Sequence, residues 1–121
     1  MKTILLVDDE RHVLSALKRS LRNEGYQILT ANSGYEALDL LKNNDVHLVI
    51  SDQRMPEMTG TQLLHQVRKN YPETVRVMLS GYADADAILG AVNLGHIYQF
   101  QTKPWNDTDL RHSIQNCITH Y

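Results

Sequence analysis

The residues LVISD (48–52) form a short apolar run that ends on a carboxylate, and QRMP (53–56) follows it directly. A continuous apolar run of this length predicts a strand that is buried on both faces, as in a parallel sheet. Asp52 would then lie at the carboxyl end of the strand, where open α/β sheets place their functional groups. One such strand indicates little more than a polar turn, but the chain repeats the arrangement.

The rest of the chain alternates between strand patterns and helix patterns. Apolar and β-branched runs predict strands at 3–7, 27–31, 46–51, 75–79 and 97–102. Apolar residues at helical spacing predict helices at about 11–24, 34–43, 60–70 and 84–94, and a last helix that is capped by Asn106 or Asp107. This order predicts an α/β fold, a flavodoxin-like (βα)5 doubly wound sandwich with a parallel five-stranded sheet in the order 2-1-3-4-5.

Local signals place several helix ends. Ser33 with Glu36, and Thr59 with Gln62, match the capping box that starts a helix. Gly25 stands where a left-handed residue would end the first helix. The helix at 84–94 is rich in alanine and has a thin apolar face, so we expect it to be the most easily displaced.

Composition narrows the class of protein. The chain has 121 residues, which fits one domain, and its net charge of −2 offers neither a basic surface for nucleic acid nor a strong field for a membrane. No apolar run is long enough to span a bilayer. The single cysteine, Cys117, excludes an internal disulfide and a cysteine metal cage. We therefore expect a cytoplasmic protein that binds neither nucleic acid nor membrane directly.

Polar residues follow four of the predicted strands. Asp8 and Asp9 follow the first, Asp52 ends the third, Ser80 follows the fourth and Lys103 follows the fifth. The carboxyl ends of parallel strands share one edge of the sheet, so we expect these side chains to meet there. Three carboxylates repel one another unless a cation offsets them, and an all-oxygen donor set suits Mg²⁺ or Mn²⁺.

This constellation indicates phosphoryl chemistry. Asp52 is a candidate nucleophile toward a phosphoryl group. The metal, Lys103 and Ser80 would each stabilise one of the phosphoryl oxygens, by position and charge.

Taken together, these residues resemble the receiver domain of bacterial two-component response regulators. The motifs that carry the resemblance are Val7-Asp8-Asp9-Glu10, Asp52 with Met55-Pro56 and Gly60, Leu79-Ser80-Gly81, and Lys103-Pro104. The resemblance covers essentially all of the chain. We therefore expect residues 1–121 to form one receiver domain, which is either complete or cut from a longer regulator with a C-terminal output domain.

The resemblance implies a role for each site residue. Asp52 would accept a phosphoryl group from a sensor histidine kinase, with Lys103 and Ser80 beside it. Mg²⁺ would be held by Asp9, Asp52 and the backbone carbonyl of Arg54, with Asp8 acting through water. The peptide bond between Lys103 and Pro104 would be cis.

The resemblance also implies a switch. Ser80 would turn toward the phosphoryl group and Phe100 would follow it. The face formed by the helix at 84–94, the strand at 97–102 and the last helix would then change shape. An output domain in the same chain or a separate effector protein would read that face, which could also form a homodimer. Arg54 and Tyr82 occupy the positions that tune dephosphorylation, and two bulky groups there predict slow loss of phosphate.

Three residues depart from the common pattern of the family. Gln53 is polar where an apolar residue is usual, Ser80 replaces threonine and Trp105 replaces phenylalanine.

Three other functions fit the sequence less well. A Mg²⁺-dependent phosphohydrolase with an aspartyl nucleophile would need an acid/base aspartate two residues later, where this chain has Arg54. A nucleotide-binding domain would need a glycine-rich turn after the first strand. A degenerate receiver that serves only as an interaction scaffold is disfavoured by the intact acidic set. A phosphoacceptor signalling domain, rather than a turnover enzyme, is the leading hypothesis.

Overall fold

The computed structural model describes residues 1–81 and 99–119, although the side chains of Ser80, Gln99, Phe100 and Thr102 are not among those described. The strands in this part of the chain are β1 (Thr3–Val7), β2 (Gln27–Ala31), β3 (Leu48–Asp52), β4 (Val75–Ser80) and β5 (Gln99–Thr102). The helices are α1 (Arg11–Leu21), α2 (Gly34–Asn43), α3 (Gly60–Asn70) and α5 (Asp107–Thr119). The predicted helix at 84–94 lies outside the described residues.

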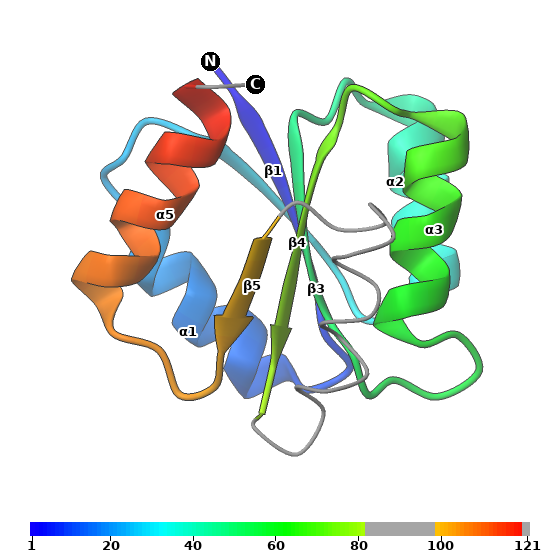
Figure 1. Ribbon diagram of the computed structural model, residues 1–121, viewed down its shortest axis with the longest axis horizontal. Helices are drawn as coiled ribbons and strands as arrows, with labels where there is room; N and C mark the ends of the chain where they lie inside the picture. Colours follow the sequence, from blue (N-terminus) through cyan, green and yellow to red (C-terminus); the bar gives the residue numbers. More distant parts are fainter. Residues whose placement is uncertain (82–98, 120–121) are drawn as a thin grey trace.

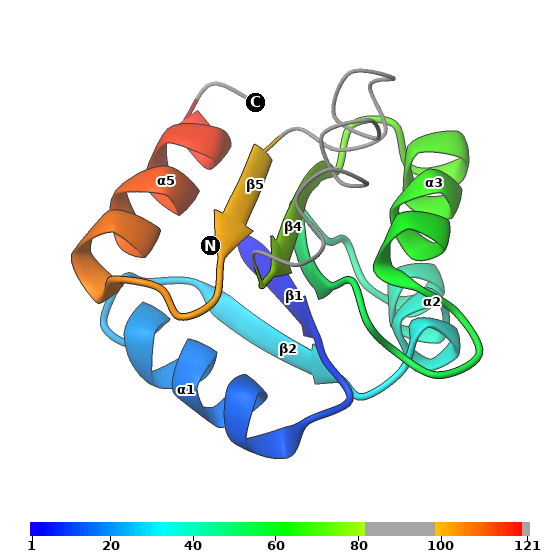
Figure 2. The same cartoon turned by 60° about the horizontal axis from the view of Figure 1, so that its bottom comes forward.

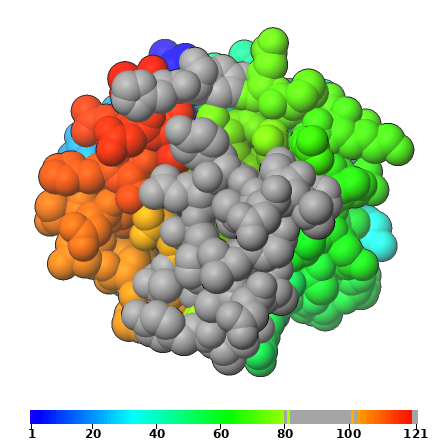
Figure 3. Space-filling model, viewed as in Figure 1, coloured from blue at the N-terminus to red at the C-terminus, as the bar shows by residue number. Residues whose placement is uncertain are grey.

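The strands form one parallel sheet in the order β2-β1-β3-β4-β5. Helices α1 and α5 cover one face of this sheet, and α2 and α3 cover the other (Figures 1 and 2). In the space-filling view, atoms of α5 and of α3 lie on opposite sides of the molecule (Figure 3). The predicted flavodoxin-like fold and strand order are confirmed.

The alternation of side chains along β1, an interior strand of the sheet, divides the core into two parts. Ile4 and Leu6 of β1 pack with the apolar faces of α1 and α5. Leu5 and Val7 point to the opposite face and pack with α2 and α3. Strand β1 is fully buried along its length. A strand that is buried on both faces explains why its sequence is a continuous apolar run.

The structure corrects the predicted end of the first helix. Helix α1 ends at Leu21, three residues before the predicted end at Glu24, and Arg22 is already extended with φ −63° and ψ 144°. Asn23 has a φ of 75°, in the left-handed region, and Gly25 follows with a φ of 82°. Asparagine enters that region more readily than most residues, so the chain leaves the helix before it reaches the glycine.

Strand bounds also differ slightly from the prediction. Strand β3 begins at Leu48 rather than at residue 46, and Asp52 is its last residue. Strand β4 extends one residue further than predicted, to Ser80. Residues 97 and 98, which were predicted to start the fifth strand, lie outside the described part.

The helix caps agree with the sequence with one exception. At Thr59 the capping box is complete, because its side chain accepts from the Gln62 N–H and the Gln62 side chain accepts from the Thr59 N–H. At Ser33 only half of the predicted box forms. The Ser33 hydroxyl accepts from the Glu36 N–H, but the Glu36 carboxylate accepts from the N–H of Asn32, one residue before the cap.

The last helix is capped by the first of its two candidate residues. The Asn106 side chain accepts a hydrogen bond from the Asp109 N–H at 3.0 Å.

No helix in the described residues is long and apolar enough to cross a membrane.

Candidate functional site

The carboxyl edge of the sheet brings together two carboxylates and one ammonium group. Asp8 directly follows β1, Asp52 ends β3, and Lys103 directly follows β5. The Nζ atom of Lys103 lies 3.0 Å from Oδ2 of Asp8 and 2.9 Å from Oδ1 of Asp52. Asp8 is 0% exposed and Asp52 only 5%, so one ammonium group bridges two buried acids.

Asp8 is held by both of its oxygens. While Oδ2 accepts from Lys103, Oδ1 accepts from the backbone N–H of Glu10 at 2.9 Å. Residues Asp8 and Asp9 are neighbours in the chain, yet Asp8 is buried and Asp9 is exposed. The structure therefore gives the two predicted acids different surroundings, with Asp8 next to Lys103 and Asp9 open to solvent.

Burial sets the protonation behaviour of these groups. Desolvation raises the pKa of Asp8 and of Asp52 above the ordinary value for aspartate, although Lys103 acts in the opposite direction on both. The negative charge of Asp8 raises the pKa of Asp52 further. For Lys103, burial disfavours the charged form, but its hydrogen bonds to Asp52 and Asp8 and their charges together outweigh burial, so its pKa is raised. The site therefore holds a protonated lysine and two carboxylates. The favourable effect of Lys103 on these carboxylates does not fully offset the cost of burying their charge.

An acidic group lies beside this ion pair. Ligand oxygens of Asp8, Asp9 and Glu10 all lie within 4.8 Å of one another. Carboxylate oxygens, with exposed members that leave room for water, are the donors that Mg²⁺ prefers. The donor set therefore fits the implied ion. Glu10 was absent from the predicted ligands, although it continues the run Asp8-Asp9 in the sequence.

Asp52 is not a member of that acidic group. Its Oδ1 atom contacts Lys103 instead.

The loop after Asp52 is closed by the side chain of Gln53. Its Oε1 atom accepts from both the N–H and the hydroxyl of Thr61, each at 2.8 Å, and its carbonyl accepts from the Gly60 N–H at 3.0 Å. These bonds join the first residue after β3 to the first turn of α3. The sequence identified Gln53 only as a departure from the usual pattern, because its partners are seven and eight residues away.

Gly60 makes the closest approach between α3 and β3. A Cβ atom at this position would overlap the carbonyl oxygen of Asp52 and would lie 2.9 Å from its carbonyl carbon. Only glycine therefore allows α3 to begin against the backbone of the candidate phosphoacceptor.

The structure describes only some of the remaining predicted residues. The Lys103–Pro104 peptide bond, which the resemblance implies to be cis, is cis in the structure. The backbone of Ser80 pairs with Thr102, so it lies at the same edge as Lys103. The side chains of Ser80 and Phe100, and Tyr82 as a whole, lie outside the described residues. Arg54 is exposed in the loop before α3.

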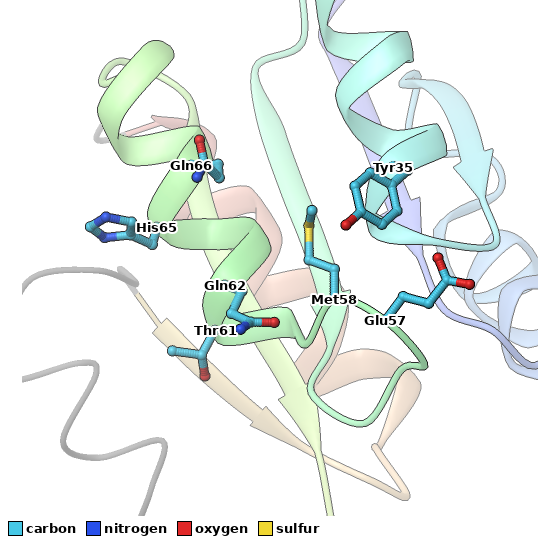
Figure 4. A pocket seen from close by; sticks show the side chains of 7 residues that line it. All are labelled: Tyr35, Glu57, Met58, Thr61, Gln62, His65 and Gln66. Carbon is cyan, nitrogen blue, oxygen red and sulfur yellow. The ribbon is translucent and has the colours of Figure 1, made fainter.

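A separate groove lies between α2 and α3. Its volume is about 420 Å³. Tyr35, at the start of α2, and Met58, in the loop before α3, point toward one another across it (Figure 4). The other lining residues are Glu57, Thr61, Gln62, His65 and Gln66. Neither Asp52 nor Lys103 lines this groove, so it is distinct from the acidic site.

The chain belongs to the response regulator receiver domain family, whose model matches residues 4–115. It is similar to the hydrogenase transcriptional regulatory protein HoxA of Cupriavidus necator, at 40% identity over 116 residues that make up 96% of this chain and 24% of HoxA.

Solved structures agree. An uncharacterized protein from Neptuniibacter caesariensis has a TM-score of 0.94 and 47% identity, over 98% of this chain and 87% of that chain. The signal receiver domain of an HD domain-containing protein from Pseudomonas fluorescens Pf-5 has a TM-score of 0.92 and 36% identity, over 98% and 88%.

These relationships define the class of protein. The chain is a receiver domain homologous to those of two-component response regulators. Such domains are generally non-enzymatic signalling domains that work with a histidine kinase and an output domain, and they typically bind Mg²⁺ at an acidic pocket. The chain spans about a quarter of the length of HoxA, at 24%.

Proposed function

We propose that Asp52 is the phosphoacceptor of this receiver domain and that Lys103 is its principal cationic partner. The observation that carries the proposal is the position of the Lys103 ammonium, 2.9 Å from Asp52 and 3.0 Å from Asp8. A half-buried ammonium beside a nucleophilic carboxylate is suited to receive the negative charge of a phosphoryl group.

The position of Lys103 beside Asp52 supports phosphoryl transfer to this carboxylate. An Asp52 carboxylate oxygen attacks the phosphorus atom of a phosphohistidine on a sensor histidine kinase. The new P–O bond forms as the P–N bond breaks, and the electron pair leaves with the imidazole, which takes a proton from solvent. Lys103 keeps its proton throughout, because its pKa is raised, and it stays positively charged beside the phosphoryl oxygens.

The metal site is proposed from the same residues. Asp9, Asp52 and the backbone carbonyl of Arg54 would hold Mg²⁺ or Mn²⁺, with Asp8 acting through water. Such an ion, when bound, offsets the charge of the phosphoryl oxygens. Glu10 lies close enough to Asp8 and Asp9 to contribute a further oxygen or a hydrogen bond to water.

The signal would leave the site through a change of conformation. Ser80 and Phe100 are the proposed switch, and the face formed by the segment 84–94, β5 and α5 would pass the change to an output domain in the same chain, to an effector protein or to a second copy. We propose slow dephosphorylation, tuned by Arg54 and Tyr82. Relatives named as transcriptional regulators support a longer chain in which residues 1–121 form the receiver domain of a cytoplasmic regulator.

The experiment is phosphorylation by acetyl phosphate in the presence of Mg²⁺, followed by intact-mass analysis. We expect one acid-labile phosphoryl group, which is also labile in base, on the wild type and none on Asp52→Asn. Asp45→Asn is the matched control, because the Asp45 side chain is 98% exposed. It belongs neither to the ion pairs of Lys103 nor to the acidic group of Asp8, Asp9 and Glu10. Undiminished labelling of Asp52→Asn would refute the assignment.

A second measurement separates this function from its alternatives. Mg²⁺-dependent binding of beryllofluoride to the wild type is expected of a working phosphoacceptor. A scaffold without phosphorylation would bind none. A phosphohydrolase would release inorganic phosphate over many turnovers instead of stopping near one phosphoryl group per chain.

A further inference from the structure

Trp105, two residues after Lys103 in the chain, belongs to a hydrogen-bonded cluster. The indole Nε1 of Trp105 donates to Oγ of Ser20 at 3.0 Å and to Oδ1 of Asp107 at 3.2 Å. Ser20 Oγ in turn lies 2.6 Å from the same Asp107 oxygen. We call these three residues, Ser20, Trp105 and Asp107, the Trp105 clamp.

Ser20 is the centre of the clamp. It lies in the last turn of α1 and is only 4% exposed. A hydroxyl has one proton to donate, and the 2.6 Å distance to a carboxylate is much shorter than the 3.1 Å distance to the Ala16 carbonyl. Ser20 therefore donates to Asp107 and accepts from Trp105, so all three members are linked.

A second bond fastens the same turn of α1 to α5. The carbonyl oxygen of Ser20 accepts from Nη1 of Arg111 at 3.2 Å. This carbonyl belongs to the end of α1, where backbone acceptors have no partner within the helix. Helices α1 and α5 lie side by side on one face of the sheet (Figure 2). The clamp is therefore anchored to two helices that already pack together.

Trp105 also takes part in packing. It is partly buried against the apolar core that includes residues of α1 and α5. It also lines a hollow of about 290 Å³ together with Ala16, Arg19, Ser20, Pro104 and Asp107. The hydrogen bonds of the clamp add a directional constraint to this packing.

We propose that the Trp105 clamp positions Lys103 for the phosphoryl group on Asp52, an inference that rests on the function proposed above. Lys103 is tied to the sheet on one side, where β5 ends at Thr102. On the other side only Pro104 separates it from Trp105. Holding Trp105 against α1 fixes the start of the long, flexible lysine side chain and limits the positions that Nζ can reach.

The proposal assigns a physical role to an unusual residue. The family resemblance implies phenylalanine at this position, and a phenylalanine ring has no N–H to donate. Trp105 is a positioning residue: it acts through Lys103. Its hydrogen bonds also connect α1 with the phosphorylation site, since Ser20 lies on that helix.

Trp105→Phe and Ser20→Ala test the clamp without touching Asp52, Asp8 or Lys103. Removing a hydrogen bond of ordinary strength predicts about a three- to tenfold slower phosphorylation by acetyl phosphate and a similar loss of beryllofluoride affinity. Mg²⁺ affinity should stay within about twofold of the wild type, because the clamp holds none of the proposed metal ligands. Ser20→Thr, which keeps the hydroxyl and has the hollow beside it for the added methyl group, should restore both quantities.

The Lys103 ammonium gives a readout in the absence of metal and phosphate. In the wild type its two carboxylate partners slow proton exchange, so we expect a ¹⁵N-edited NMR signal for Nζ at low temperature. In Trp105→Phe and Ser20→Ala this signal should broaden or disappear. A role of the tryptophan that is limited to packing would leave it unchanged in Ser20→Ala.

The matched control is Ser113→Ala. It removes a hydrogen bond of 2.8 Å between Gln101 of β5 and Ser113 of α5, and it leaves the clamp intact. This variant should phosphorylate and bind beryllofluoride as the wild type does, even where its melting temperature falls.

Two results would overturn the proposal. One is unchanged phosphorylation and beryllofluoride affinity in both clamp variants. The other is an equal loss in Ser113→Ala, which would trace the effect to general destabilisation. A wild type that fails to phosphorylate refutes the proposed function instead, so the two failures are distinguishable.

Discussion

Gly60→Ala should destabilise the fold by forcing helix α3 away from strand β3. A Cβ atom at Gly60 would overlap the Asp52 carbonyl oxygen, and it would lie 2.9 Å from the Asp52 carbonyl carbon and 3.0 Å from Cα of Gln53. All three are backbone atoms, two of Asp52 at the buried end of β3 and one of the residue that follows it. These backbone atoms cannot move aside through a side-chain rotation. Either helix α3 or the end of strand β3 must therefore shift.

The size of the effect follows from two opposing contributions. Overfilling a well-packed interior costs typically about 1–3 kcal/mol, and the upper end applies here because the obstacle is backbone. Alanine regains roughly 0.5–1 kcal/mol over glycine in a helix. We therefore expect a net loss of about 2 kcal/mol in the free energy of unfolding. For a domain of this size that lowers the melting temperature by roughly 6–10 °C.

The measurement is urea unfolding and thermal melting, with Gly34→Ala as the matched variant. At Gly34 a Cβ atom would lie 2.5 Å from Sδ and 3.0 Å from Cβ of Met58. A flexible methionine side chain can largely move aside, so we expect at most about 1 kcal/mol of destabilisation there. Gly60→Ala should also slow phosphorylation, since the displaced backbone carries Asp52. Equal stability of the two variants would refute the argument that backbone contact sets the cost.

The other predictions concern pH and the core. Burial raises the pKa of Asp52, so the unfolded state loses its proton first and the free energy of unfolding falls as pH rises from about 4 through the raised pKa. Without metal, Asp52→Asn should therefore be more stable than the wild type at pH 7, with the gap closing below pH 4 in urea titrations. Burial raises the pKa of the Cys117 thiol to about 11, so an aromatic disulfide reagent at pH 8 should react quickly with this thiol only after unfolding. The unfolded state loses the thiol proton first, so the free energy of unfolding should fall between about pH 9 and 11. Leu64→Ala, at a site that is 0% exposed, should cost about 2–5 kcal/mol, and the partly buried Leu40→Ala clearly less; equal losses in denaturant titrations would contradict the assigned burial.

The fold class could be predicted because the relevant signals are local. Runs such as 4–7 and 48–50 are apolar without interruption, which is typical of a strand that is covered on both faces. Alternation with helices then requires parallel strands, and parallel strands place all their carboxyl ends on one edge. The meeting of Asp8, Asp52 and Lys103 follows from this rule, although they lie far apart in the sequence.

Details that depend on backbone geometry were harder to predict from the sequence. The first helix was predicted to end beside Gly25, but Asn23 had already entered the left-handed region. Glycine is the stronger signal in a sequence, whereas the actual stop depends on where the chain must turn toward β2. The Ser33 box formed only in part, because Glu36 reached the N–H of Asn32 instead of that of the cap.

The sequence by itself determined the parallel sheet, its order and the set of polar residues at its carboxyl edge, since these depend on apolar periodicity and on the position of each residue relative to a strand end. Only the tertiary structure decided that Asp8 and not Asp9 pairs with Lys103, and that Trp105 bonds to Ser20 of α1. Both depend on which side chains point inward and meet across elements as many as 95 residues apart. No local pattern specifies such contacts, because they exist only after the helices have packed on the sheet.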